Sequence, residues 1–100
     1  MENSVAPVPS KELKLEIKRL ILDTLKISDV KAEDIDEGAS LFENNPVVQL
    51  DSVDALEIVM ALQRTYKVHI DDQNVSRFII RSVDTIAEFV AKEQAKQKSA

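Results

Sequence analysis

The chain has 100 residues, no cysteine and a formal net charge of −5. Its length suits a single domain with one core, and the absence of cysteine excludes disulfides, thiolate metal ligands and a cysteine nucleophile. No apolar run approaches the length of a membrane span or a signal-peptide core, so we expect a cytoplasmic location and no membrane insertion.

The N-terminal part of the sequence predicts a tail and then a helix. Residues 1–9 hold two prolines and show no helical period, which is typical of a flexible tail. Ser10 is a suitable N-cap for a helix that we expect to end near Lys26. Helical spacing places one set of residues on its core face: Leu13, Ile17, Leu20, Ile21 and Thr24. The basic residues at its sides are Lys11, Lys14, Lys18 and Arg19.

Residues 27–50 form a long predicted connection. Four apolar residues are expected to hold it against the core: Ile35, Leu41, Phe42 and Val47. A connection of this length in a small domain is usually functional or contains a short helix of its own.

The second helix, predicted from Asp51–Ser52 to near Tyr66, has two apolar faces. The residues expected to face the core are Ala55, Ile58, Val59, Leu62 and Tyr66. Val53, Leu56 and Met60 fall on the opposite side, beside Glu57 and Arg64. Exposed apolar residues rimmed by charge indicate a docking surface, and the predicted partner-binding residues are Val53, Asp54, Leu56, Glu57 and Met60. In the alternative, Leu56 turns into the bundle.

Two further helices complete the predicted bundle. A short one over residues 72–81 has Val75, Phe78 and Ile79 on its buried side. Ser82 caps the last helix, whose apolar face consists of Val83, Ile86, Phe89 and Val90, and residues 93–100 are expected to be a frayed tail. The single glycine and three prolines leave room for long helices. We therefore expect an all-α four-helix bundle over residues 10–92, with three main helices and one short one.

Negative charge is concentrated in the middle of the chain. Residues 29–72 hold eleven acidic and three basic residues, a net charge of −8, while both flanking segments are slightly positive. An acidic centre excludes a nucleic-acid backbone as partner and favours basic protein surfaces. A merely solubilising surface is the alternative.

Ser52 lies at the predicted start of the second helix. Asp51 or Ser52 could be a simple N-cap. The same position would also tolerate a covalently attached phosphate, because the first N–H groups of a helix are unpaired and its N-terminal end is positively polarised. Spacing alone does not decide between the two.

The wider sequence resembles the acyl carrier protein family. LDSVDALEIVMAL, at residues 50–62, resembles the family signature, in which Asp-Ser and an aliphatic residue open the second helix. AEDIDEGASLFE resembles the family's acidic loop, YKVHIDD its turn after the second helix and RSVDTIAEFV its final helix. The resemblance spans about residues 11–91.

This resemblance implies that Ser52 receives 4′-phosphopantetheine from coenzyme A through a phosphopantetheinyl transferase, with Asp51 helping the transferase to position its metal. The arm would hold acyl groups as thioesters for acyltransferase-, ketosynthase-, ketoreductase- and dehydratase-type enzymes with basic docking patches. A carrier of this kind is not an enzyme, and we expect a monomer. The cargo would lie between the second helix and residues 72–81, shielded by Ile58, Leu62, Phe78 and Ile79, unless those side chains only fill the core.

The sequence departs from the housekeeping pattern of this family. Gln49 stands where glycine is usual, and Gln63 and Arg64 replace acidic residues. The loop before Ser52 and the third-helix region are longer, which resembles carriers of specialised pathways such as aryl polyene synthesis. Two alternatives remain: a helical adaptor without a prosthetic group, and a carrier of amino acids.

Other kinds of site have weaker support. His69 with Asp71 and Asp72 lacks a closed set of metal ligands, so no metal site is expected. Residues 34–38 do not have calcium-loop spacing. Ser52 and His69 lack an accompanying oxyanion-hole motif.

Overall fold

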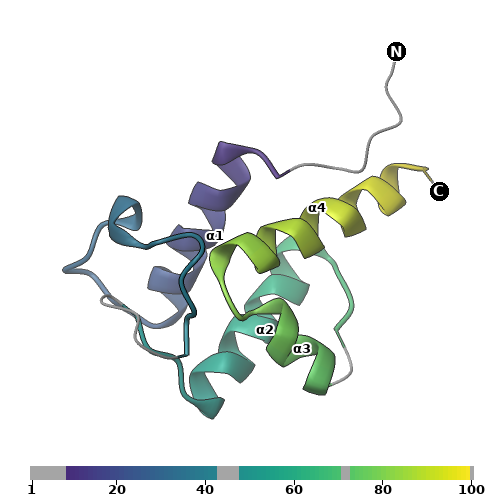
Figure 1. Ribbon diagram of the computed structural model, residues 1–100. Coiled ribbons are helices and arrows are strands. Elements are labelled where there is room, and N and C mark those ends of the chain that lie inside the picture. The colour runs from purple at the N-terminus through teal and green to yellow at the C-terminus, as the bar shows by residue number, and fades with distance from the viewer. Residues whose placement is uncertain (1–8, 43–47, 71–72, 100) are drawn as a thin grey trace.

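The computed structural model describes residues 9–42, 48–70 and 73–99. These residues form four α-helices and one 3₁₀-helix, η1: α1 (Lys11–Thr24), η1 (Ala32–Asp34), α2 (Ser52–Tyr66), α3 (Gln73–Ile79) and α4 (Val83–Ser99). No strand occurs within these ranges. The predicted all-α bundle of three main helices and one short helix is confirmed (Figure 1).

Helix α1 begins and ends with local hydrogen bonds. The N–H of Leu13 donates to Oγ of Ser10 at 3.0 Å, which confirms the predicted N-cap. At the other end, the N–H of Ile27 donates to the carbonyl of Leu22 at 2.8 Å, and Lys26 has a left-handed φ of 58°. This is the Schellman arrangement, and it ends the helix two residues before the predicted limit.

The buried face of α1 differs from the predicted one. Lys18, expected at the side of the helix, is only 8% exposed, and Leu22 is also buried. The first connection explains the difference, because it lies beside α1 (Figure 1) and its Glu37 carboxylate contacts Nζ of Lys18 at 2.9 Å. A lysine can be buried when a carboxylate pairs with it.

The first connection is held by buried side chains and backbone bonds. Ile35 and Leu41 are buried as predicted, and so are Ala32, Val48 and Leu50, whereas Val47 lies outside the described residues. Leu41 donates its N–H to the carbonyl of Arg81 and accepts the N–H of Leu50, both at 2.7 Å. Leu41 therefore ties the connection to the turn before α4 and to the residues just before α2.

In helix α3, the predicted burial of Phe78 is wrong. Phe78, expected on the buried side, is 68% exposed, while Ile79 and Ile80 are 6% and 1% exposed. Successive residues of a helix are about 100° apart, so turning Ile79 and Ile80 inward points Phe78 to solvent. The side chain of Val75 lies outside the described part of the structure.

Helix α4 is longer than predicted. Ser82 caps it through Oγ, which accepts the N–H of Thr85 at 3.1 Å. The helix continues to Ser99 instead of ending in a frayed tail from residue 93. An ion pair between Lys96 and Glu93 at 3.1 Å and a hydrogen bond from Nε2 of Gln97 to the carbonyl of Lys67 at 3.1 Å stabilise this last part.

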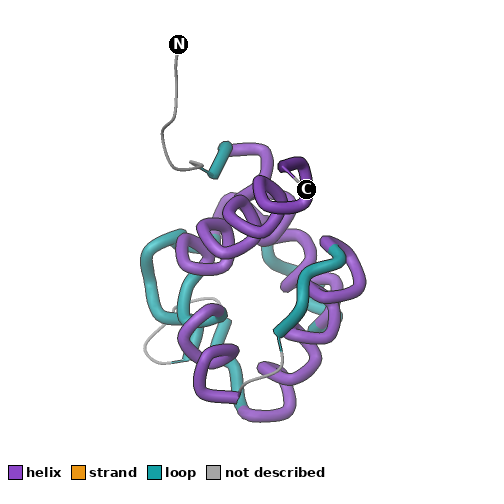
Figure 2. The backbone as a smooth tube through the Cα atoms, turned by 90° about the vertical axis from the view of Figure 1, so that its right-hand side faces the viewer, coloured by secondary structure: helices purple, strands orange, loops and turns teal. Residues whose placement is uncertain are grey.

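The main helices share one core. Helix α1 packs against α2 and α4, and α3 packs against α4. Figure 2 shows the helices arranged around an interior, and buried residues including Ile21, Ile58, Leu62 and Ile86 fill it. Tyr66 closes one edge of this core and donates its O–H to Glu16 at 3.1 Å, and burial raises the pKa of its hydroxyl.

Candidate functional site

The N-terminal end of α2 is capped by Asp51 and not by Ser52. The N–H of Asp54 donates to the Asp51 carboxylate at 2.8 Å, and the N–H of Asp51 donates to the Asp54 carboxylate at 3.3 Å. This reciprocal pair is a capping box. Of the two candidate caps that the sequence offered, Asp51 is therefore the N-cap.

Ser52 is therefore the first helical residue, and its hydroxyl has no capping role. The residue is exposed, and no described residue forms a hydrogen bond with its hydroxyl. It lies in the first turn, where backbone N–H groups are only partly used and the helix dipole favours negative charge. An incoming group can reach this oxygen, and an anion bound to it would be electrostatically stabilised.

Helix α2 presents the two predicted faces. Ile58 and Leu62 are fully buried and Val59 is 8% exposed, whereas Val53, Leu56 and Met60 are 65%, 60% and 50% exposed. Leu56 therefore does not turn into the bundle. Glu57 is exposed and Asp54 is half-buried, so carboxylates flank the exposed apolar residues. The three residues Val53, Leu56 and Met60 are called the exposed stripe below.

A pocket of about 410 Å³ lies between α2 and α3. Ser52, Leu56, Val59, Met60 and Gln63 line it from α2, while Ile70, Arg77 and Ile80 line it from the segment that follows. The residues on α2 recur every three or four positions, with Val59 and Met60 adjacent, so they form one continuous side of that helix. Ser52 and Gln63 are separated by about 16 Å along the helix axis at 1.5 Å per residue. The pocket thus begins at the exposed serine and extends along most of α2.

The predicted shielding residues do not line this pocket. Ile58, Leu62 and Ile79 are buried in the core, and Phe78 faces solvent. The predicted region between α2 and residues 72–81 does contain a pocket, but different side chains form it. The signal that would have found them was present in the sequence, since positions 52, 56, 59 and 63 share one helical side between the two apolar faces.

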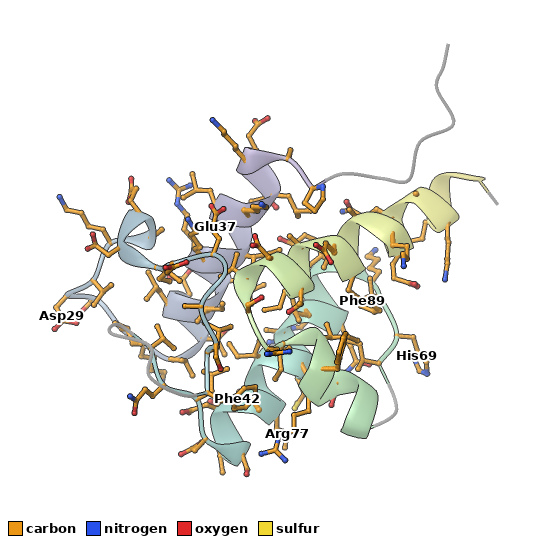
Figure 3. All side chains as sticks on the ribbon, in the orientation of Figure 1. Asp29, Glu37, Phe42, His69, Arg77 and Phe89 are labelled. Carbon is orange, nitrogen blue, oxygen red and sulfur yellow. The ribbon has the colours of Figure 1, made fainter. Side chains whose placement is uncertain are left out.

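One wall of the pocket joins the first connection to α3. The guanidinium of Arg77 lies over the ring of Phe42, 5.7 Å from its centroid. Figure 3 shows the two labelled side chains beside each other, one from the connection and one from α3. Sequence reasoning placed Phe42 against the core and assigned no role to Arg77.

The described residues hold neither a metal cluster nor a helix that could span a membrane. No group of three or more His, Cys, Asp or Glu residues suited to a metal occurs in the described ranges. Asp71 and Asp72, which the sequence analysis considered together with His69, lie outside those ranges. Among the described helices, none has the length and apolar character needed to cross a bilayer.

Comparison with known proteins gives one consistent group of relatives. No protein-family model matches the chain. The acyl carrier protein of Sinorhizobium fredii is 32% identical over 79 residues, covering 79% of this chain and 91% of the relative. That of Nitratidesulfovibrio vulgaris is 32% identical over 78 residues, with 78% and 92% covered. That of Buchnera aphidicola is 29% identical over 87 residues, with 87% and 99% covered.

Proposed function

This chain belongs to the acyl carrier protein family, and on that basis we propose that it carries acyl intermediates of fatty acid or polyketide-type synthesis on Ser52. The acyl groups are held as thioesters on a covalent 4′-phosphopantetheine arm. The protein performs no chemistry of its own and presents one cargo to several enzymes, most simply in the cytoplasm.

The observation that carries this proposal is that Asp51, and not Ser52, caps helix α2. Asp51 accepts the N–H of Asp54 at 2.8 Å, so the Ser52 hydroxyl can be modified without loss of the cap. In the attachment step, Oγ of Ser52 bonds to a pyrophosphate phosphorus of coenzyme A. A phosphorus–oxygen bond breaks, the adenosine bisphosphate leaves, and a base of the transferase takes the hydroxyl proton. The resulting phosphodiester lies where the helix dipole stabilises it.

Once bound, the arm supplies a terminal thiol that forms the thioester. The residues around Ser52 fit such a group, since the hydroxyl is exposed and a pocket begins beside it. In this proposal the acyl chain lies in the pocket between α2 and α3, against Leu56, Val59 and Ile80. Burial there removes apolar chain surface from water.

The exposed stripe is the proposed docking surface for the transferase and for the acyltransferase-, ketosynthase-, ketoreductase- and dehydratase-type enzymes. Val53, Leu56 and Met60 supply apolar contact area. Asp51, which is exposed, and the neighbouring Asp54 and Glu57 would attract basic patches on those enzymes and speed their association. Met60 suits a surface with several partners because its side chain is adaptable.

Three exposed cations on α2 and in the α3 region support a dedicated set of partners, such as those of a specialised pathway. Arg64 lies on α2, and Arg77 and Arg81 lie in and just after α3. A partner recognised through charge must match them with acidic residues, in addition to its basic patch.

Intact-mass analysis after co-expression with a promiscuous phosphopantetheinyl transferase tests the proposal. The wild type should gain one phosphopantetheine and Ser52→Ala none. Ser28→Ala, which removes another exposed serine, should gain one as the wild type does. A wild type that keeps its unmodified mass would overturn the carrier function and leave an adaptor without a prosthetic group. Gain of mass by Ser52→Ala would overturn the assignment of the serine.

A further inference from the structure

The pocket between α2 and α3 combines apolar walls with two groups of hydrogen-bond donors. Leu56, Val59 and Ile80 are among its apolar residues, while Gln63 and Arg77 bring amide and guanidinium N–H groups. Among the described residues, no carboxylate lines it. A pocket of this kind binds apolar matter and orients it through a few polar contacts.

The amide of Gln63 has a defined orientation. Its Oε1 accepts the N–H of the buried Ile70 at 3.0 Å. A backbone N–H requires an acceptor, so the oxygen of the amide must face Ile70 and the NH₂ group must be the other end. No described residue accepts a hydrogen bond from this NH₂ group, and Gln63 is half-buried. The pocket therefore contains an oriented donor that has no acceptor within the described part of the chain.

The guanidinium of Arg77 is oriented by a different contact. Its central carbon, Cζ, lies over the ring of Phe42, 5.7 Å from the ring centroid. A cation–π contact supplies no hydrogen-bond acceptor to the guanidinium, so its five N–H donors can still bond to an oxygen of the cargo. Among the described residues, no carboxylate lines the pocket beside Arg77 or pairs with it.

From these two residues we infer that the pocket selects acyl chains that bear an oxygen substituent, such as 3-oxoacyl or 3-hydroxyacyl chains, over saturated chains. The inference rests on the proposed carrier function and adds the class of cargo. A carbonyl or hydroxyl oxygen would accept from Gln63 or Arg77 while the rest of the chain contacts the apolar wall. A saturated chain would cover the Gln63 amide without replacing its bonds to water, which is unfavourable.

Nuclear magnetic resonance of ¹⁵N-labelled protein tests the inference on the wild type. Four forms of the protein are compared: unmodified, carrying the arm alone, octanoyl-loaded and 3-oxooctanoyl-loaded. In the two loaded forms, an amide replaces the thioester that joins the acyl chain to the arm. The side-chain NH₂ signals of Gln63 and the Nε–H signal of Arg77 should move in the 3-oxooctanoyl form and stay near their unloaded positions in the octanoyl form.

Gln63→Glu provides a matched variant. It keeps an oxygen for the N–H of Ile70 and replaces the NH₂ donor by an acceptor. With natural thioesters, the 3-oxooctanoyl cargo should hydrolyse about fivefold faster on this variant than on the wild type, the factor that one typical net hydrogen bond gives. The octanoyl cargo should hydrolyse at the same rate on both. Gln94→Glu, which makes the same substitution on α4 outside this pocket, should alter neither rate.

The other possible results contradict either the cargo inference alone or the carrier function as well. If the two loaded forms give the same Gln63 and Arg77 shifts, or if those signals already move with the arm alone, the cargo inference is wrong and the carrier function stands. If intact mass shows that the arm never attaches, the carrier function fails and the inference fails with it.

Discussion

The N–H of Asp54 donates to the carboxylate of Asp51 at 2.8 Å, across the residue that we propose to be modified. The reverse bond, from the N–H of Asp51 to Asp54, measures 3.3 Å. This pair stabilises the start of α2 without help from the Ser52 side chain. The structural and chemical roles at this helix end therefore belong to different residues, and substitutions should separate them.

Asp51→Ala should lower the free energy of unfolding by about 1 kcal/mol, because it removes an N-cap acceptor. Ser52→Ala should change it by less than about 0.5 kcal/mol, as expected for an exposed residue without structural partners. Urea denaturation of the two variants beside the wild type measures both changes. A loss for Ser52→Ala equal to that for Asp51→Ala would show that the serine shares the cap.

Leu56→Ser should weaken docking without weakening the fold, because Leu56 is 60% exposed. We expect the transferase KM to rise roughly five- to thirtyfold, which corresponds to about 1–2 kcal/mol for an interface contact. Phe78→Ser removes an apolar side chain of similar exposure from α3 and should leave KM near its wild-type value. Equal effects of the two substitutions on KM would argue against a docking surface on α2.

Phe78→Ser and Ile80→Ala should differ sharply in stability. Phe78 is 68% exposed and Ile80 is 1% exposed. The first change should cost less than about 0.5 kcal/mol, and the second about 2–5 kcal/mol because it leaves a cavity in the core. Thermal or urea unfolding measures the difference, and comparable losses would mean that α3 is rotated relative to the arrangement described above.

Most of the helical framework could be predicted from the sequence because it depends on local signals. Ser10 and Ser82 act as the caps that their positions suggested, and α2 covers Ser52–Tyr66 as expected. Phe78 was misplaced because a helix of seven residues is too short for periodicity to define which side faces the core. The end of α4 was misplaced because it depends on Gln97 reaching Lys67, a contact between residues distant in sequence.

In the candidate site, too, features that depend on local sequence could be predicted and features that depend on distant contacts could not. The exposed stripe follows from the helical period of α2, and the predicted exposure of Val53, Leu56 and Met60 is confirmed. The donors of the pocket could not be predicted, since they require Gln63 to meet Ile70 and Arg77 to lie over Phe42. The choice of Asp51 as cap required the backbone geometry itself.

An ion-pair cluster joins α1, the first connection and α4, and it should govern the response to pH. Glu37 contacts Lys18 at 2.9 Å and Lys14 at 3.5 Å, and Lys14 also contacts Asp84 at 3.0 Å. The hydrogen bond from Lys18 lowers the pKa of the Glu37 carboxyl. The hydrogen bond to Asp84 raises the pKa of the Lys14 ammonium. Glu37 should therefore stabilise the fold at pH values above its unfolded pKa of about 4.3. Lys14 should stabilise the fold at pH values below its unfolded pKa of about 10.4.

Glu37→Gln should lower the free energy of unfolding at pH 7 by about 1 kcal/mol, because Lys18 is largely buried and loses its charged partner while keeping an acceptor oxygen. The stability contributed by Glu37 is lost as pH falls through its lowered pKa, so the curves of the wild type and the variant should converge below about pH 4. Urea denaturation from pH 3 to pH 8 measures this. Glu33→Gln is the control, since Glu33 is exposed and pairs with no described cation. A difference between wild type and Glu37→Gln that stays constant down to pH 3 would assign the effect to packing and not to charge.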